Sequence, residues 1–258
     1  MGAIDKVAEL TAAHRARSLG RVRRRLAGGA VLALLLAACG GGGAEPTAPP
    51  PAEARWVVLG SSTAAGVGAT PGQSWVSRLA AALQPRGVRI DNRARSGATT
   101  YQALPASSAR PAGRPATDPA QDAAQALATR PAALVLAFPS NDAMAGFTAA
   151  ETTANLLLIR DLARQQGAAV IVLSSQPRDD AGSAAREAMR SADATLAAAL
   201  GACFVDVREA LSGPGGGIAA AYSAGDGVHL NDAGHGLVFE RLRSTLEGGR
   251  CFSLPAAS

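Results

Sequence analysis

The stretch that decides the fold is RWVVLGSS, residues 55–62. It opens with a short apolar run, which Gly60 stops before two serines follow. An apolar run of this length, ended by glycine, predicts a β-strand that is buried on both faces. The serines then fall at the turn where the strand passes into a helix, and a hydroxyl at such a turn can reach the rim of the sheet.

The same apolar pattern recurs four times farther along the chain, with helical periodicity in between. Alternating buried strands and helices favour a parallel sheet that is covered on both faces. Right-handed crossovers then give an α/β protein of the flavodoxin-like class, a three-layer α/β/α sandwich with a five-stranded parallel sheet. We expect further strands over residues 88–90, 133–138, 169–174 and 203–207, and helices over 73–83, 118–129, 148–167, 183–200 and 232–246.

Polar segments stand at the places where such a sheet binds its ligand. Ligands bind beyond the carboxyl ends of the strands, so residues that directly follow a strand are candidates. Segments 60–66, 92–100 and 139–142 each follow a strand, and segment 226–235 leads into the last helix. Taken singly, each of the first three also fits an ordinary turn or helix cap.

The spacing within these segments points to nucleophilic chemistry. Asp226 and His229 lie three residues apart in a loop, so the carboxylate can accept from the imidazole Nδ1 and leave Nε2 free to take a proton. Asn141 carries an amide that can donate to a developing oxyanion.

In this order the four segments resemble the SGNH (GDSL) hydrolase family. The resemblance implies that Ser62 is the nucleophile and that Asp226 and His229 complete the triad. It also implies an oxyanion hole formed by the backbone N–H groups of Ser62 and Gly97 and the side chain of Asn141. The same α/β/α sandwich is the family fold.

Two positions depart from the family pattern. Ser61 stands where the family has an aspartate, which leaves a choice between Ser61 and Ser62 as nucleophile, and we favour Ser62. Pro139 replaces a glycine and so has a fixed φ and no N–H. His235 competes with His229 as the base, but we expect it in the first turn of the last helix, where a histidine is more often structural.

The resemblance implies a serine esterase that hydrolyses acyl esters through an acyl-enzyme, without a cofactor or a metal. Short-chain acyl esters, O-acetyl groups on glycans and lysophospholipids all stay open as substrates. The alternative is a non-catalytic extracytoplasmic ligand-binding lipoprotein that uses the same cleft. A Walker-type loop and a Schiff-base lysine are excluded, because Lys6 is the only lysine in the chain.

The N-terminal sequence resembles a bacterial lipoprotein signal. Basic residues at 21–25 precede an apolar run over 26–38, which is too short to span a bilayer and ends at Cys39. Leu36 to Cys39 resembles the lipobox, in which the cysteine carries a diacylglyceryl group. A signal anchor, or a buried helix with an incidental cysteine, is the alternative.

We therefore expect three parts: a signal peptide (1–38), a Gly/Pro-rich tether (39–54) and a hydrolase domain (55–258). The protein would be exported, anchored to the cell envelope through Cys39, and monomeric. Its partner would be a small-molecule, glycan or lipid ester.

Charge and cysteine usage narrow the partners further. The formal charge is +5, but seven of the 25 basic residues lie within the first 38 positions and the remainder of the chain is neutral. The remainder of the chain therefore lacks the excess of basic residues that binding to nucleic acid requires.

In an exported chain Cys203 and Cys251 favour a disulfide, although two separate buried thiols stay possible. The cysteines and histidines lack the spacing of a zinc site.

Overall fold

The computed structural model describes residues 53–138 and 140–256. The expected signal peptide, Cys39, nearly all of the expected tether and Pro139 lie outside the described residues. The sheet begins at Ala54, the last residue that we assigned to the tether.

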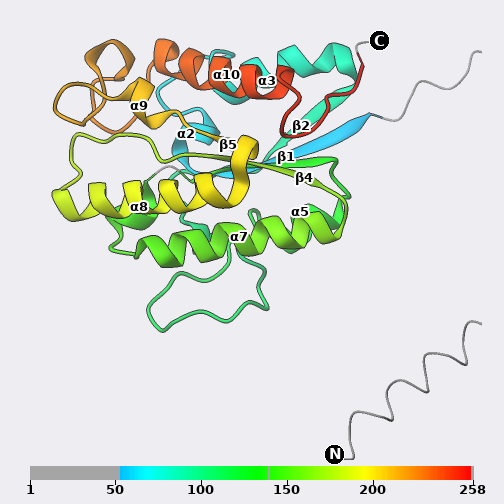
Figure 1. The fold of residues 1–258 in the computed structure, drawn as a ribbon, viewed down its shortest axis with the longest axis horizontal. Helices are drawn as coiled ribbons and strands as arrows, with labels where there is room; N and C mark the ends of the chain where they lie inside the picture. Colours follow the sequence, from blue (N-terminus) through cyan, green and yellow to red (C-terminus); the bar gives the residue numbers. More distant parts are fainter. Residues whose placement is uncertain (1–52, 139, 257–258) are drawn as a thin grey trace, which may run out of the picture. The chain divides into compact units, whose positions relative to one another are not determined.

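Five parallel strands form the centre of the domain (Figure 1), and their order in the sheet is β2-β1-β3-β4-β5. The register pairs Trp56 with Ile90 on one side of β1 and with Ala133 on the other. The strands are β1 (Ala54–Gly60), β2 (Val88–Asn92), β3 (Ala133–Ala137), β4 (Ala169–Leu173) and β5 (Phe204–Val205).

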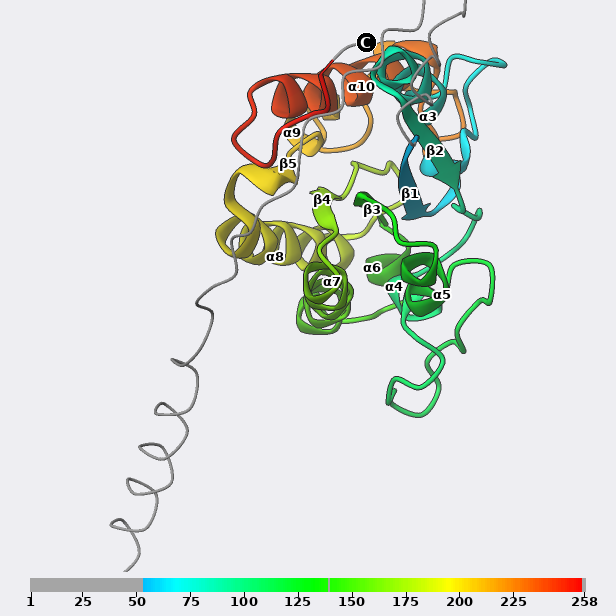
Figure 2. The same ribbon diagram turned by 90° about the vertical axis from the view of Figure 1, so that its right-hand side faces the viewer.

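Helices cover both faces of this sheet, and Figure 2 shows the layers on edge. One face carries α3 (Trp75–Leu83) and α10 (Asp232–Glu247), and the other carries α5 (Ala123–Ala128), α7 (Ala149–Gln165) and α8 (Ser183–Leu200). Single turns connect them: α2 (Ser62–Ala65), α4 (Thr100–Ala103), α6 (Asn141–Met144), α9 (Arg208–Leu211) and the 3₁₀ turns η1 (Gln84–Arg86), η2 (Gly201–Cys203) and η3 (Ala220–Tyr222). The three-layer α/β/α class expected from the sequence is confirmed.

Alternate residues of each strand feed two separate cores. Trp56 and Val58 of β1 pack into the core beneath α3 and α10. Val57 and Leu59 face the opposite core beneath α7. This alternation follows from the two-residue period of a strand, and it explains why β1 carries a continuous apolar run. The sheet is therefore a rigid platform whose carboxyl edge holds the polar loops.

Most expected elements agree with the structure to within two residues at each end, but one helix and one strand are much shorter than the sequence indicates. The helix expected over 118–129 is confined to α5, because Asp118 closes its own turn on Ala120 and Asp122 provides the N-cap. The expectation that the helix begins at 118 is therefore wrong. The strand expected over 203–207 ends at Val205, because the N–H of Val207 donates to Ser174 Oγ instead of a neighbouring strand.

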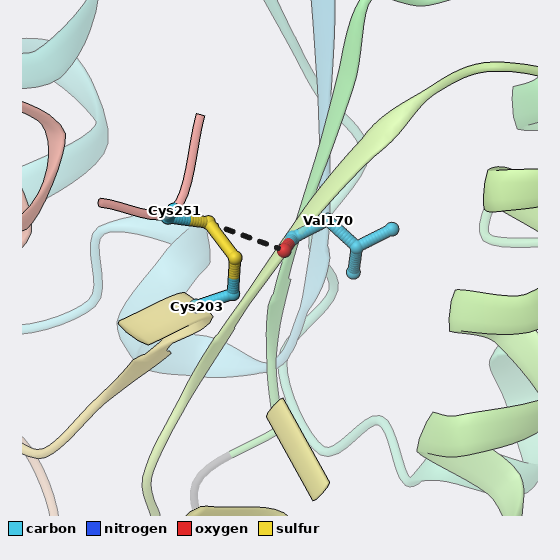
Figure 3. The surroundings of a disulfide bond; sticks show 3 residues. All are labelled: Val170, Cys203 and Cys251. Carbon is cyan, nitrogen blue, oxygen red and sulfur yellow. Dashed lines mark hydrogen bonds between the residues drawn. A yellow bond between two sulfur atoms is a disulfide. The ribbon is translucent and has the colours of Figure 1, made fainter. Parts of the chain in front are cut away.

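The C-terminal tail is joined to the start of β5 by a disulfide between Cys203 and Cys251. Their Cα atoms lie 4.8 Å apart. Cys251 Sγ lies 3.9 Å from the carbonyl oxygen of Val170 at the start of β4 (Figure 3). The bridge therefore lies at the amino ends of the strands. Among the described residues, no helix combines the length and the apolar character needed to cross a membrane.

Candidate active site

The polar loops gather at the carboxyl edge of the sheet. Helix α2 follows β1, segment 93–98 follows β2 and α6 follows β3. Two backbone bonds join segment 93–98 to the end of β1, from Arg93 N–H to Val58 O (2.9 Å) and from Arg95 N–H to Gly60 O (3.0 Å). The loop after β2 is thereby held beside the end of the strand that leads into the two serines.

The two serines have different environments. Ser61 is the N-cap residue of α2, is 1% exposed, and its Oγ has no hydrogen-bond partner among the described residues. Ser62 is the first helical residue and is partly exposed. The first N–H groups of a helix have no intrahelical acceptor, so the Ser62 N–H is available to a ligand. Of the two serines, Ser61 is buried and Ser62 is the one with exposed surface.

Gly97 and Asn141 lie on adjoining segments. Gly97 has φ +79°, a left-handed conformation that suits glycine, and a Cβ built on it would meet no atom within 4 Å. The side chain of Asn141 donates from Nδ2 to the carbonyl oxygen of Ala98, at 2.9 Å. One amide hydrogen of Asn141 is therefore committed to the Gly97 loop, and the other stays available to an oxyanion.

Asp142, the residue after Asn141, holds α6 in place through hydrogen bonds to Thr100. Its carboxylate is 3% exposed and accepts from the N–H (2.9 Å) and the hydroxyl of Thr100. Asn155 of α7 donates to the same hydroxyl at 2.9 Å. Burial raises the pKa of the Asp142 carboxyl above its usual value, against the lowering effect of the Thr100 hydrogen bonds. Asp142 holds α6 against α4 and thus keeps Asn141 beside Ala98.

Asp226 and His229 form a bonded pair. His229 Nδ1 lies 2.6 Å from Asp226 Oδ2, and the backbone N–H groups of His229 (2.7 Å) and Val228 (2.9 Å) both donate to Asp226 Oδ1. The hydrogen bonds from the His229 backbone, the imidazole and Val228 hold the pKa of Asp226 well below its usual value. The carboxylate stays ionised, so Nδ1 is kept as the protonated nitrogen and Nε2 as the basic one.

The His229 loop packs directly on the turn that follows α2. Gly68 lies in that turn with φ +89°, and a Cβ built on it would come within 2.2 Å of Leu230 O and 3.2 Å of His229 Cβ. Thr70 donates to the Asp232 carboxylate from its N–H (2.7 Å) and its hydroxyl (2.8 Å). These contacts bring His229 to the exit of the helix that begins with Ser62.

His235 has a structural environment. It lies in the first turn of α10, as the sequence indicates, and is 0% exposed. Its Nε2 lies 3.1 Å from Val67 O, and its Nδ1 accepts from the Trp75 N–H at 3.4 Å. Burial lowers its pKa, which favours the neutral ring with Nε2 as donor. With both nitrogens engaged, His235 offers no free base.

The segment after β4 contributes two further residues. In the sequence, Arg178, Asp179 and Asp180 fit either a lining of the rim or, more simply, a solvated charge run, but the Arg178 side chain is only 12% exposed. It pairs with Asp180 at 2.7 Å and donates to Asn141 Oδ1 at 3.4 Å. Gln176, two residues earlier, is buried and bonded to Thr63. The signal was available, since both residues follow a strand of the parallel sheet.

No cluster of three or more histidine, cysteine, aspartate or glutamate side chains within metal-binding reach occurs in the described ranges.

Residues 58–237 match the model of the GDSL-like Lipase/Acylhydrolase family. Comparison with curated protein sequences gives no significant match. Among solved structures the chain resembles TesA, at 24% identity and a TM-score of 0.56, over 75% of this chain and 98% of that one. It also resembles a GDSL-like lipase from Bacteroides thetaiotaomicron, at 19% identity and a TM-score of 0.56, over 76% and 89% of the two chains.

A third similar structure is a variant of an acetyl-xylooligosaccharide esterase from Geobacillus, at 17% identity and a TM-score of 0.55, over 75% and 94% of the two chains. These likenesses support the fold. The family match spans most of the chain and includes the segments described above. The chain therefore belongs to the GDSL-like lipase/acylhydrolase family, and it is an SGNH-type carboxylic ester hydrolase.

Proposed function

We propose that the protein is a serine esterase that works through a Ser62–His229–Asp226 triad and an acyl-enzyme. His229 Nε2 takes the Ser62 proton as Oγ attacks the ester carbonyl, and Asp226 stabilises the imidazolium that forms. The alcohol leaves with the proton from His229. A water, activated by the same imidazole, then releases the acid and frees the serine.

The negative charge on the oxygen of the tetrahedral intermediate must be stabilised by hydrogen-bond donors. The Ser62 and Gly97 N–H groups and the Asn141 amide are the candidates, since they are borne by segments that are hydrogen-bonded to one another. Loss of one such donor typically raises the barrier by about 3–4 kcal/mol.

One observation carries the proposal. The Asp226–His229 pair is bonded at 2.6 Å and its loop packs against the turn that leaves the Ser62 helix. Neither a binding protein nor a structural loop needs an ionised carboxylate that orients a partly exposed imidazole in a loop packed on the turn after the Ser62 helix.

A fluorophosphonate probe tests the nucleophile. We expect the folded protein to be labelled, and Ser62→Ala to lose both labelling and ester hydrolysis while its thermal midpoint changes little. Ser61→Ala is the matched control and should keep labelling, because its hydroxyl is buried. Labelling that survives in Ser62→Ala would reject the assignment. A folded protein that is never labelled would favour the ligand-binding alternative.

We propose short acyl esters, O-acetyl groups on glycans, or lysophospholipids as substrates. A series of p-nitrophenyl esters of increasing chain length would separate these classes. A maximum of kcat/KM at acetate would favour deacetylation, as in the name of the Geobacillus relative, whereas a maximum at long chains would favour a lipid.

We also propose that the enzyme is an exported, monomeric lipoprotein that is anchored through Cys39. The order of basic residues, apolar run and cysteine supports this. Incorporation of labelled fatty acid by the wild type but not by Cys39→Ser would be the expected result, and equal incorporation by both would contradict the anchor.

A further inference from the structure

A buried amide connects the two halves of the proposed catalytic pair. Gln176 lies just beyond the carboxyl end of β4 and is 3% exposed. Its Oε1 accepts from the hydroxyl of Thr63 at 2.7 Å, and its Nε2 donates to the carbonyl oxygen of Val228 at 2.7 Å. Thr63 is itself 6% exposed, so the bridge is shielded from water.

The two ends of this bridge are adjacent to the reacting groups. Thr63 directly follows Ser62 on α2, and Val228 directly precedes His229. The bonding has one direction, from the Thr63 hydroxyl to the Gln176 amide oxygen and from the amide nitrogen to the Val228 carbonyl. Each polar atom that the amide uses has a matched partner, so the side chain has one preferred orientation.

The other contacts that hold the His229 loop do not involve helix α2. Gly68 and Thr70, which approach the loop from Leu230 to Asp232 and His229 Cβ, lie in the turn after α2, and the Asp179 N–H donates to Gly227 O at 2.9 Å. Within the loop, Asp226 fixes the local turn but does not reach α2. The Gln176 bridge therefore supplies the constraint between helix α2 itself and the residue before the base.

We propose that Gln176 is a positioning residue, which sets the separation and orientation of Ser62 and His229 through its bonds to Thr63 and Val228. This inference rests on the proposed function. Proton transfer from a serine to an imidazole requires hydrogen-bond geometry, and a displacement of about 1 Å can cost about 100-fold in rate. Loss of the bridge should therefore act on the chemical step and leave substrate binding unchanged.

Two substitutions break the bridge at different points. Gln176→Met keeps the length of the central side chain without its hydrogen bonds, and Thr63→Val replaces the hydroxyl at one end by a methyl group. We expect each to lower kcat for p-nitrophenyl acetate, and the rate constant for fluorophosphonate labelling, by about 10- to 100-fold, with KM within about twofold of wild type. Thr63→Ser keeps the donor and should restore a near wild-type rate. The double variant should be little worse than the poorer single variant.

Thr153→Val is the matched control. Thr153 is also buried, at 7%, but its hydroxyl bonds only to Ala149 O within α7. We expect it to lower the thermal midpoint about as much as Thr63→Val, with no change in kcat or labelling rate.

The outcomes separate this inference from the proposed function. If Gln176→Met and Thr63→Val keep the rates of Thr153→Val while Ser62→Ala is inactive, the positioning role is wrong and the serine mechanism stands. If Ser62→Ala is active, the mechanism fails, and the positioning role fails with it. Should Gln176→Met not fold, Thr63→Val against Thr63→Ser gives the same decision.

Discussion

Ser62 and His229 lie near opposite ends of the domain sequence, so the proposed proton transfer between them depends on the hydrogen bonds that orient each side chain. The Asp226 carboxylate accepts three hydrogen bonds, two of them from His229. It therefore fixes both the tautomer of the ring and the turn that carries it. Asp226 thus stabilises the conformation of the loop and also orients the proposed catalytic base. A substitution can separate these two contributions.

Asp226→Asn keeps an acceptor oxygen for the backbone N–H groups but removes the charge. We expect the fold to persist and kcat to fall by about four orders of magnitude, because the amide favours the wrong imidazole tautomer. Steady-state kinetics and circular dichroism would check this. Because the pKa of Asp226 lies well below its usual value, we expect no loss of activity from its protonation between pH 4 and 7, and a wild-type inflection that disappears in Asp226→Asn would contradict this.

Gly68 and Gly72 provide a matched comparison at the turn after α2. Both have positive φ, but a Cβ on Gly72 meets nothing within 4 Å, whereas one on Gly68 meets Leu230 O at 2.2 Å. Gly72→Ala should cost only the conformational penalty, about 1–2 kcal/mol. Gly68→Ala should cost more and should also lower kcat, since the His229 loop must move. Urea unfolding and kinetics would test both, and equal effects would show that the close approach has no role.

At the scale of elements, helix α7 shows how local signals specify structure. Thr148 and Glu151 form the capping box that the sequence indicates. Glu151 also accepts from Arg114 (2.7 Å) and from the Tyr101 hydroxyl (3.0 Å), so the cap anchors the loop between α4 and α5. The Arg114 bond is the largest cause that lowers the pKa of Glu151 to about 2.

This pKa gives a pH dependence. The pKa of Glu151 in the folded protein lies below the ordinary glutamate value of 4.5, so the stabilisation is fully present above about pH 4.5 and is lost as pH falls towards about 2. Glu151→Gln keeps most of the cap geometry and should cost about 1–2 kcal/mol at pH 7. Its difference from wild type should shrink towards pH 2. Urea unfolding across this range is the measurement, and a difference that does not depend on pH would contradict the charge-based account.

Elements that depend on local signals were predictable, and those shaped by distant side chains were not. The period of α8 and the capping box of α7 lie within their own sequences, and both helices were expected correctly. Strand β5 ends early because Ser174, 33 residues away, takes the N–H of Val207. Helices α2 and α6 have four residues each, too few to show a period.

The pairing of residues within the candidate site follows from equally local signals. Its motif residues follow strands or share one loop, so spacing alone brings Asp226 and His229 together. Gln176 and Arg178 also follow a strand, but a glutamine has no chemical signature and a neighbouring acid made Arg178 resemble a surface charge. Their roles emerge only from partners 37 to 113 residues away in the chain.

At the scale of the whole molecule, the candidate active site and the disulfide lie at opposite ends of the strands of one sheet. The candidate site lies at the carboxyl ends of the strands, and the Cys203–Cys251 bridge lies near Val170 at the amino ends (Figure 3). The sequence between the two cysteines includes the His229 loop and α10. The bridge therefore restricts the unfolded chain in the segment that carries the proposed base, without touching the candidate site.

Removal of the bridge should separate stability from activity. The cysteines are 48 residues apart, for which loop-closure entropy gives about 4 kcal/mol of stabilisation. We expect the double variant Cys203→Ser with Cys251→Ser to unfold on the order of 10 °C lower. At 25 °C, where it is still folded, its kcat should stay within about twofold of wild type, because the platform beneath the site is the intact sheet. Thermal unfolding of both proteins with and without a reductant measures the first effect, since only the wild type should respond to the reductant. A large loss of kcat in the folded variant would show instead that the tail reaches the chemistry through β4 and β5.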